Sequence, residues 1–427
     1  MTSVVSVREY YEVTNFQTSS EPRIMLFDLA TGGHHPSYIR YLVEYWRNEN
    51  LAGNLFIVVS PEFLKKYVDV VSLACFSVNF VAISPEEAKK LEKIKRIIKR
   101  ASFEWKLFCK YARGLQINHA VLMYFDHFQL PLAFGANAPC SFSGIYFRPT
   151  FHYNDFPNYT PNWKDKIRQW RQKFILSRTL QNRQLKALFC LDSFAVEHIK
   201  QFSKQVKIIH LADPVQVYNN NEINDIKFKA ISQKKSLNIC PDRKVLLLFG
   251  KLNSRKGIYQ TLEAIKLLPI ETCKKICLLL VGEVSATEKL TIEACIQEIL
   301  ESSPVQIITN FEFITEEEVA VYFQMTDIVL APYQRHVGMS GILLLAAAAQ
   351  KPVLASDYGL MGQLVLSSQL GVTVDSTSAS NIAKKLQELV TISPNKLCDI
   401  TSINQFAKNH SSMNFSQVIF DSFLNAQ

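Results

Sequence analysis

Short apolar runs alternate with amphipathic stretches along the sequence, in two series that one polar segment separates. Runs that are apolar on both faces predict strands buried on both sides, as in parallel sheets covered by helices. Helical stretches such as Pro36–Asn48 and Pro85–Lys99 lie between the runs, which indicates repeated βαβ units. The strands predicted for the first series are Ile24–Leu29, Leu55–Val59, Phe80–Ile83, Ala120–Phe125, Ala187–Leu191 and Val206–His210.

The second series follows residues 211–243, which are polar, rich in Asn and Lys and weakly periodic, as is typical of a connection between domains. We therefore predict an α/β fold of two Rossmann-like, doubly wound domains that face each other across a cleft. The first domain spans residues 1–210 and the second residues 244–405, and a C-terminal helix in 406–427 packs back on the first domain. The predicted strands of the second series are Val245–Phe249, Ile276–Val281, Val305–Ile308, Ile328–Ala331, Val353–Ala355 and Val372–Val374, and its helices include Ile258–Leu268, Thr287–Ser302 and Glu316–Gln324.

Several features of the sequence favour a cytoplasmic protein. The N-terminal sequence MTSVVSVREYYEVTNF lacks the basic flank and apolar core of a signal peptide, and no stretch of about 18 uncharged apolar residues could span a bilayer. The nine cysteines are scattered and show no zinc-ligand spacing, so we expect reduced, buried thiols. The net charge of +9 is compatible with phosphorylated substrates, an anionic membrane or nucleic acid.

The first motif of the second half is a strand, a glycine turn and a basic loop that opens a helix, Leu246–Gly257. Such turns lie at the carboxyl end of a parallel sheet, where open α/β folds bind their ligands. Gly250 permits close approach of the backbone, while Lys251, Arg255 and Lys256 offer cations for a diphosphate. The alternative is an ordinary solvated basic loop.

The second motif runs from His336 to Gly359 and contains a loop of small residues before a helix predicted at Ile342–Gln350. Backbone N–H groups of such a loop favour an anion, so we assign the loop to the same diphosphate. The residues of this loop are Gly338, Met339, Ser340 and Gly341.

The order of these motifs resembles the donor domain of family 4 glycosyltransferases, which have the GT-B fold. The resemblance rests on strand–G[RK]–x–RKG–helix, then Ala-Pro-Tyr, the glycine-rich loop and A-A-x-x-K-P-V-L-A-S-D-x-G, over about residues 245–390. Phe189–Ser193 and His210-Leu-Ala-Asp-Pro are similar to that family's strand–Ser–helix element and hinge. The resemblance implies a retaining transfer of a sugar from a nucleotide-diphosphate donor, a hexosyltransferase type of enzyme that uses neither metal nor cofactor. The absence of a D-x-D triplet agrees with that.

The sequence also departs from that family. Val337 and Leu345 stand at the two positions where the family commonly has the glutamates of its E-x7-E pattern, the second of which usually holds the ribose. Gln363 replaces a further glutamate, and Lys251 replaces an arginine, which removes bidentate geometry.

Two polar clusters follow predicted strands of the first half. Gly32 and Gly33 precede His34 and His35 after the first strand, a loop that commonly closes over the donor and acceptor in the family. His35 could bind phosphate or orient an acceptor hydroxyl, although surface histidine pairs are usually inert.

Asp126 and His127 end another predicted strand and could bind sugar hydroxyls or deprotonate an acceptor. Family members often carry a histidine here that touches the donor sugar, so His127 is the first catalytic candidate. Helix capping by Asp126 is the competing interpretation.

Two basic segments carry apolar stripes, residues 89–113 and Asn162–Phe174. Basic faces with Trp and Phe suit an anionic membrane surface, hence a lipid acceptor and a place at the cytoplasmic face of a membrane. The alternative is two ordinary helices that pack inward, and the acceptor could equally be a glycan or a small molecule. Trp105 and Trp163 are the residues whose removal would test membrane contact.

The sequence gives less support to an oxidoreductase or to a nucleic-acid-binding protein. No G-x-G-x-x-G follows a strand with an acid about twenty residues on, which counts against a nicotinamide-dependent oxidoreductase. No recognised nucleic-acid-binding module is present. A catalytically silent protein that binds a sugar nucleotide stays open, because the paired glutamates are missing.

Overall fold

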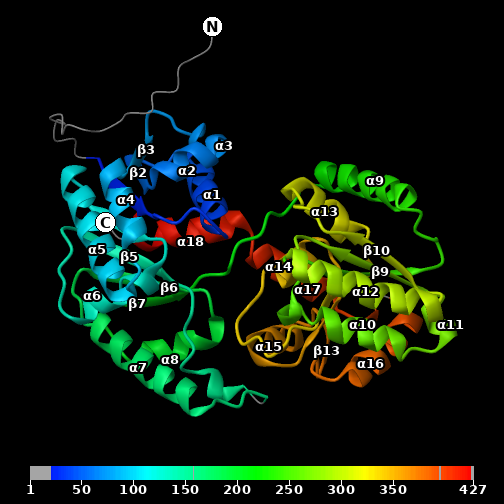
Figure 1. Cartoon of the computed structure of the whole chain (residues 1–427). Coiled ribbons are helices and arrows are strands. Elements are labelled where there is room, and N and C mark those ends of the chain that lie inside the picture. Colours follow the sequence, from blue (N-terminus) through cyan, green and yellow to red (C-terminus); the bar gives the residue numbers. More distant parts are fainter. Residues whose placement is uncertain (1–20, 157, 394–395, 425–427) are drawn as a thin grey trace, which may run out of the picture. The chain divides into compact units, whose positions relative to one another are not determined.

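The computed structural model describes residues 21–156, 158–393 and 396–424, which group into two compact units (Figure 1). Unit 1 takes in residues up to His152, residues 161–214 and the chain from Ser412 on. Unit 2 comprises Tyr153–Thr160 and Val215–Ser411. The N-terminal sequence considered for a signal peptide lies outside the described residues.

Unit 1 contains a seven-stranded sheet in the order β3-β2-β1-β4-β5-β6-β7, in which every neighbouring pair is parallel. Strand order reverses beside β1, so the loops after β1 and β4 lie at the switch point where doubly wound folds bind ligands. The strands are β1 (Arg23–Phe27), β2 (Asn54–Val59), β3 (Val78–Ala82), β4 (His119–Leu122), β5 (Ser141–Tyr146), β6 (Leu185–Cys190) and β7 (Lys207–His210).

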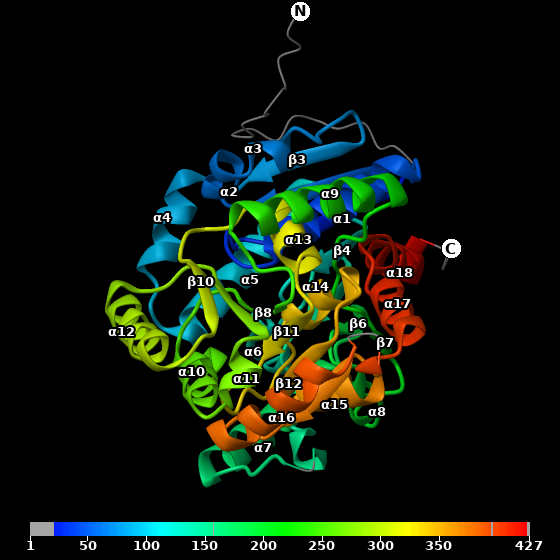
Figure 2. The same ribbon diagram turned by 90° about the vertical axis from the view of Figure 1, so that its right-hand side faces the viewer.

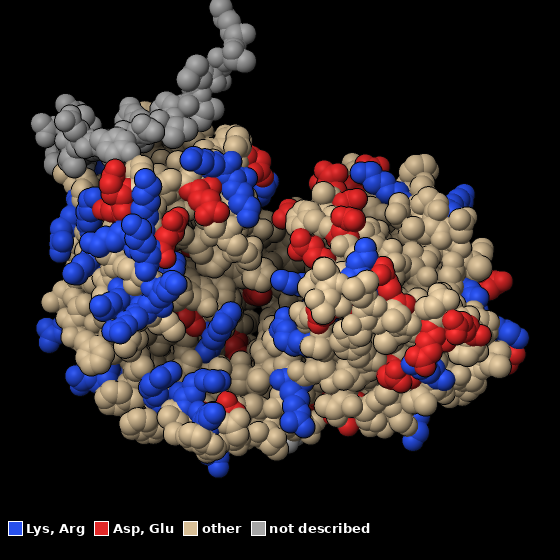
Figure 3. All heavy atoms as spheres, in the orientation of Figure 1, with Lys and Arg blue, Asp and Glu red and all other residues tan. Residues whose placement is uncertain are grey.

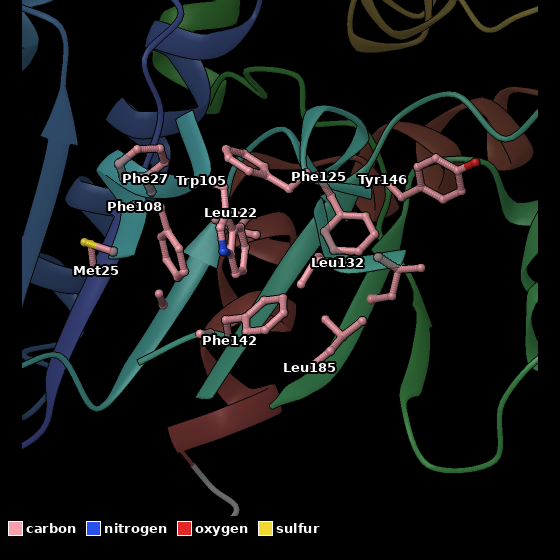
Figure 4. Packing of buried hydrophobic residues seen from close by; sticks show 14 of the residues in the cluster. Met25, Phe27, Trp105, Phe108, Leu122, Phe125, Leu132, Phe142, Tyr146 and Leu185 are labelled. Carbon is pink, nitrogen blue, oxygen red and sulfur yellow. The ribbon is translucent and has the colours of Figure 1, made fainter. Parts of the chain in front are cut away.

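Helices cover both faces of this sheet because its strands are apolar on both sides. In β1, Met25 and Phe27 belong to one core cluster, and Ile24 and Leu26 to another. Figure 4 shows the first cluster, where aromatic rings from β1, β5 and α5 interdigitate. The helices of unit 1 are α1 (His35–Asn48), α2 (Pro61–Lys66), α3 (Val68–Val71), α4 (Pro85–Lys93), α5 (Ile97–Gly114), α6 (Gln129–Ala133), α7 (Trp163–Thr179), α8 (Val196–Lys200) and α18 (Ser412–Leu424), with 3-10 turns at Phe125–His127 and Ser193–Ala195.

Unit 2 contains a six-stranded parallel sheet in the order β10-β9-β8-β11-β12-β13 (Figure 2). Three helices, α10, α12 and α16, pack on one face in a single apolar cluster. The strands are β8 (Lys244–Phe249), β9 (Ile276–Val281), β10 (Gln306–Asn310), β11 (Ile328–Ala331), β12 (Val353–Ser356) and β13 (Gly371–Val374). The helices are α9 (Asn220–Ser236), α10 (Ile258–Lys266), α11 (Ile270–Cys273), α12 (Ala286–Ser302), α13 (Glu316–Gln324), α14 (Ile342–Ala348), α15 (Gly359–Ser367), α16 (Ala379–Thr391) and α17 (Ile400–Asn409), with 3-10 turns at Tyr153–Asp155 and Ser254–Lys256.

The structure differs from the sequence expectations at the domain boundaries. Most of the segment 211–243 is not an irregular connection, because it forms α9, a helix of unit 2 that begins with a capping box at Asn219 and packs on α13. At the C-terminus, α17 belongs to unit 2, whereas α18 packs on α1 in unit 1 through Phe415, Ile419 and Phe420.

Residues that look alike in the two basic segments have different surroundings. Trp105, on α5, is 6% exposed and lies in the core against Phe108 and Phe142, so it is not available for membrane contact. Trp163, on α7, is exposed. The expectation of buried thiols is wrong for Cys75 and Cys240, which are exposed. Among the helices that the structure describes, none combines the length and apolar character needed to cross a bilayer.

Candidate functional site

The basic loop of unit 2 depends on glycines at both of its ends. Gly250 follows β8 with a φ of 106°, and a Cβ there would lie 3.2 Å from Nζ of Lys256. Gly257 precedes α10 with a φ of 74°, and a Cβ there would lie 2.0 Å from the carbonyl oxygen of Pro332. Only glycine fits at Gly257, so the backbone fixes where the intervening cations lie.

The three cations of this loop lie in two environments. Lys251 and Arg255 are exposed, whereas Lys256, in the 3-10 turn Ser254–Lys256, is buried. The Lys256 ammonium donates a hydrogen bond to the Tyr333 hydroxyl and lies 4.2 Å from the centroid of that ring. The Ser340 hydroxyl also donates to Tyr333, at 3.2 Å. Tyr333 therefore joins the basic loop to the loop before α14.

Burial sets the protonation of this pair. Burial, with the positive charge of Arg255 as a smaller cause, lowers the pKa of Lys256 to about 8. Burial raises the pKa of Tyr333 to about 12, so the phenol stays neutral at physiological pH. Lys256 is thus a cation that a nearby anion would stabilise strongly, because solvent screens it little.

A second contact between the two loops runs through His336. Its Nε2 lies 3.2 Å from the Met339 carbonyl oxygen and its Nδ1 lies 3.3 Å from the Arg255 guanidinium. A neutral ring that donates from Nε2 and accepts at Nδ1 satisfies both contacts. Burial lowers the pKa of His336, which favours this neutral form.

The loop Gly338–Gly341 leads into α14, which ends at Ala348 and is two residues shorter than the predicted helix. The loop is half-buried. Val337 lies beside it, and its carbonyl oxygen would be 2.7 Å from a Cβ at Gly359. Leu345, in α14, has no polar atom on its side chain, so neither position of the family's glutamate pair can accept a hydrogen bond from a ribose through its side chain.

Unit 1 contains a pocket of about 440 Å³ at the carboxyl ends of β1 and β4. It brings together the two polar clusters that sequence reasoning selected, which lie about 90 residues apart in the chain. Its lining includes the glycines Gly32 and Gly33 and the polar residues Asp28, His34, His35, Arg100, Glu104, Tyr124, His127 and Arg148.

His35 is held in this pocket by a buried carboxylate. Its Nδ1 lies 2.6 Å from Oδ2 of Asp28, whose other oxygen accepts the N–H of Ala30 at 3.0 Å. Burial alone would lower the pKa of His35, but the hydrogen bond and the negative charge of Asp28 outweigh it and raise the pKa. Nε2 is left for a ligand, because Asp28 fixes the ring through Nδ1.

His127 is held in a similar way by Glu104. The His127 Nδ1 lies 3.2 Å from Oε2 of Glu104, and the Arg100 Nε donates to Oε1 at 2.8 Å. Burial alone would raise the pKa of Glu104, but its bonds to His127 and Arg100 outweigh burial and lower it. Glu104 is thus an anion that orients a half-exposed imidazole.

Asp126 does not line the pocket, although it precedes His127. Its carboxylate accepts the backbone N–H groups of Phe147 and Arg148, at 2.9 and 3.2 Å, just beyond β5. Burial raises its pKa to about 6. These contacts favour a structural role, in which Asp126 caps the end of a strand rather than the following helix.

Sequence reasoning missed several residues of these sites. Asp28 and Glu104 hold the two histidines, and Tyr333 and His336 join the two loops of unit 2. Tyr333 belongs to Ala-Pro-Tyr, a motif that supports the family resemblance and does not by itself assign a contact to the tyrosine. A carboxylate directly after the first strand was a usable signal for Asp28, whereas nothing local distinguishes Glu104 from other acids on helices.

The region that contains the unit 2 loops is similar to a known family. Residues 230–405 match the family model described as glycosyl transferases group 1. The matched region covers less than half of the chain. It contains both loops that Tyr333 joins, and it begins within α9, upstream of the predicted boundary at residue 244. No curated protein matches the sequence.

Solved structures resemble the chain along almost its whole length. A glycosyltransferase from Rickettsia africae ESF-5 has a TM-score of 0.63 at 13% identity, over 96% of this chain and 100% of that one. Anabaena Alr3699/HepE in complex with UDP has a TM-score of 0.63 at 12% identity, over 94% and 100%. The N-terminal domain of Candida albicans trehalose-6-phosphate phosphatase has a TM-score of 0.64 at 12% identity, over 98% and 100%. The predicted fold class is confirmed, since two parallel α/β sheets with helices match the GT-B glycosyltransferases.

Proposed function

We propose that this protein is a glycosyltransferase that moves a sugar from a nucleotide-diphosphate donor, and that unit 2 binds the donor. The observation that carries the proposal is the buried, Tyr333-bound ammonium of Lys256 between two glycine-bounded loops. The region similar to glycosyl transferases group 1 contains these loops, which makes a sugar nucleotide the best-supported ligand.

In this proposal, the donor diphosphate contacts Lys256 together with the exposed Lys251 and Arg255. Each charge-assisted hydrogen bond of this kind contributes about 1.5–3 kcal/mol. Backbone N–H groups of Gly338–Gly341 supply uncharged donors nearby, since Ser340 shares Tyr333 with Lys256. The similar Anabaena structure was solved with UDP, which supports a nucleotide diphosphate as ligand.

The same groups would act in the reaction. When the bond between the anomeric carbon and the phosphate oxygen breaks, negative charge grows on the diphosphate, and fixed cations stabilise it. We propose a retaining reaction, as the resemblance implies, in which the acceptor attacks from the face that the diphosphate leaves. Three cations around the diphosphate could neutralise this charge without a metal ion, so we propose metal-independent transfer.

The pocket of unit 1 supports a role in holding hydroxyl groups. Asp28 and Glu104 each fix one imidazole, which leaves Nε2 of His35 and His127 to bond a sugar or acceptor hydroxyl. We propose His127 as the contact to the transferred sugar and His35 as the group that orients the acceptor hydroxyl. Asp126 is not proposed as a catalytic group, because both of its oxygens are engaged by backbone.

The proposal is tested by incubating the full chain with a panel of UDP- and GDP-sugars and measuring the release of nucleoside diphosphate. The wild type should turn over at least one donor, and Lys256→Ala should lose that activity while it keeps its fold by circular dichroism. Proton NMR of the released sugar, recorded before the sugar mutarotates, should show the anomer of the donor. If no donor is turned over and no nucleotide protects the protein against heat, the proposal that this protein is a glycosyltransferase is contradicted.

A silent sugar-nucleotide-binding protein is the second candidate, and Val337 and Leu345 favour it. Such a protein would be protected against heat by UDP or GDP and would release no sugar. The two outcomes of the panel therefore separate the candidates, because binding and turnover are read independently.

A further inference from the structure

The helix α7 of unit 1 packs inward through only one of its faces. Gln169, Leu176 and Thr179 are buried on that face. The Gln169 side-chain amide donates to the Thr150 carbonyl at 3.2 Å, and the Thr179 hydroxyl donates to the Gln129 carbonyl at 3.0 Å. These contacts fix the rotation of the helix, so the direction of its other face is determined.

The opposite face carries a continuous row of large apolar side chains, which we call the exposed aromatic stripe. Trp163, Ile167, Trp170 and Phe174 are 67, 55, 69 and 56% exposed. Their spacing of four, three and four residues places them in one line, because each residue turns an α-helix by about 100°. The rings of Trp170 and Phe174 stack with centroids 6.1 Å apart. An outward-facing row of this size is not an ordinary solvated helix face.

Cations flank the stripe on both sides. The helix contains six basic residues and one acidic residue, Asp165, which is engaged in the capping box with Asn162. Helical geometry places Lys164, Arg171 and Arg178 along one flank, and Lys166 and Lys173 along the other. Within the described parts of the chain, none of these five forms an ion pair with a carboxylate. Figure 3 shows Lys and Arg gathered over the region where Figure 1 places α7.

The row continues into a basic pocket at the end of the helix. Arg178 lies one turn beyond Phe174 on the flank of the stripe, and it lines a pocket of about 600 Å³ together with Arg183 and the exposed Phe134. Two guanidinium groups beside an apolar ring suit the phosphate of a lipid headgroup.

We propose that the exposed aromatic stripe of α7 docks the protein on the surface of a bilayer that contains anionic phospholipids. The stripe enters the interface between headgroups and acyl chains, and the flanking cations contact the headgroup phosphates. A second copy of the chain fits this face less well, since pairing two such faces would bring ten unpaired cations together. The inference is independent of the proposed function. The residues of the stripe belong to unit 1, whereas the donor loops belong to unit 2, and the binding test does not require enzymatic activity.

The experiment is sedimentation of the full chain with vesicles of phosphatidylcholine alone and of phosphatidylcholine mixed with phosphatidylglycerol. Binding should occur only to the mixed vesicles and weaken as salt rises. Removing two flanking charges by Arg171→Gln and Lys173→Gln should weaken binding roughly 30-fold. Trp163→Gln with Trp170→Gln should weaken it roughly tenfold or more.

Tryptophan fluorescence gives a second readout, because a purely electrostatic contact with the vesicle would not change the emission wavelength. Of the four tryptophans, Trp46 and Trp105 are buried, whereas Trp163 and Trp170 lie on the stripe. Mixed vesicles should shift the emission of the wild type to the blue and leave the Trp163→Gln, Trp170→Gln variant unchanged.

The matched control is Phe228→Gln with Ile231→Gln, two exposed apolar residues of α9, which should bind vesicles as the wild type does. Equal binding of stripe and control variants would overturn the proposal, as would equal binding to the two vesicle types or no binding at low salt. Dimers in sedimentation velocity that only the stripe variants abolish, without vesicle binding, would assign the face to a second copy instead.

Discussion

The ammonium group of Lys256 lies over the ring of Tyr333, 4.2 Å from its centroid, and donates a hydrogen bond to its hydroxyl. The pair holds a cation in a place where water screens it little, at the carboxyl end of β8. Burial lowers the pKa of Lys256 to about 8. That value makes the charge of the candidate donor site sensitive to pH in an accessible range.

The affinity for UDP should therefore fall as pH rises through about 8. An anion binds the protonated ammonium, so the dissociation constant should be nearly constant below pH 7.5 and about tenfold higher at pH 9. Calorimetric titration between pH 6.5 and 9 measures this. Lys256→Arg keeps its charge over the whole range and should flatten the profile. A slope that is the same in wild type and Lys256→Arg would assign the titration to another group.

Replacing Gly257 should destabilise unit 2, because its φ of 74° and its approach to the Pro332 carbonyl exclude a Cβ. We expect Gly257→Ala to lower the free energy of unfolding by more than about 2 kcal/mol. Gly338→Ala is the matched control, since a Cβ there meets its nearest atom at 3.8 Å. Urea denaturation of both variants measures their free energies of unfolding. Equal values would show that the basic loop does not require the left-handed backbone conformation of Gly257.

Breaking the pair of Asp28 and His35 should cost more stability at low pH than at high pH. The folded pKa of His35 is raised, so its contribution is fully present below its unfolded pKa of about 6.5 and is lost as pH rises through the folded pKa. Asp28→Asn should lower the free energy of unfolding by about 1.5–3 kcal/mol at pH 5.5.

Chemical denaturation at pH 5.5 and pH 8.5 measures this difference, and the loss should be smaller at pH 8.5. A loss that is independent of pH would mean that Asp28 does not raise the pKa of His35. Asp69→Asn, at an exposed surface pair with Arg40, serves as the control and should change stability little at either pH.

The two tryptophans of the basic segments should differ sharply when each is truncated. Trp105→Ala removes a ring from the core and should cost about 3–5 kcal/mol of unfolding free energy. Trp163→Ala, at an exposed site, should stay within about 0.5 kcal/mol of the wild type. Thermal or urea unfolding compares them, and a similar loss at both positions would contradict the orientation of α7.

The sequence predicts some elements of the fold and the surroundings of some residues, but not all of them. Apolar runs such as Val245–Phe249 predicted their strands because parallel strands are buried on both faces. The strand Ser141–Tyr146 was missed because Ser141, Ser143 and Gly144 interrupt its apolar pattern. Helix α9 was missed because it buries little and its sequence is polar. Whether a Trp on a basic helix faces the core or solvent depends on the packing of the rest of the chain.

The residues of the two candidate sites can likewise be predicted from the sequence only in part. Glycines and cations next to strand ends can be found from local spacing. The structure places Gly250 and Lys256 in the basic loop and His35 in the pocket, and their functional roles stay predictions. Asp126 was selected for its place beside His127, but its carboxylate is engaged by backbone. Glu104 and Tyr333 could not be selected, because each meets its partner only through tertiary packing, 23 and 77 residues away in the chain.

The most direct measurement of the central claim is a titration of UDP and GDP onto the wild type, Lys256→Ala and His127→Ala, with donor turnover measured on the same samples. We predict that Lys256→Ala loses nucleotide affinity by roughly 10- to 100-fold, as expected for one charge-assisted hydrogen bond. His127→Ala should keep nucleotide affinity and lose turnover. Nucleotide that binds Lys256→Ala as tightly as it binds the wild type would contradict donor binding at the loop of Lys256 and Tyr333.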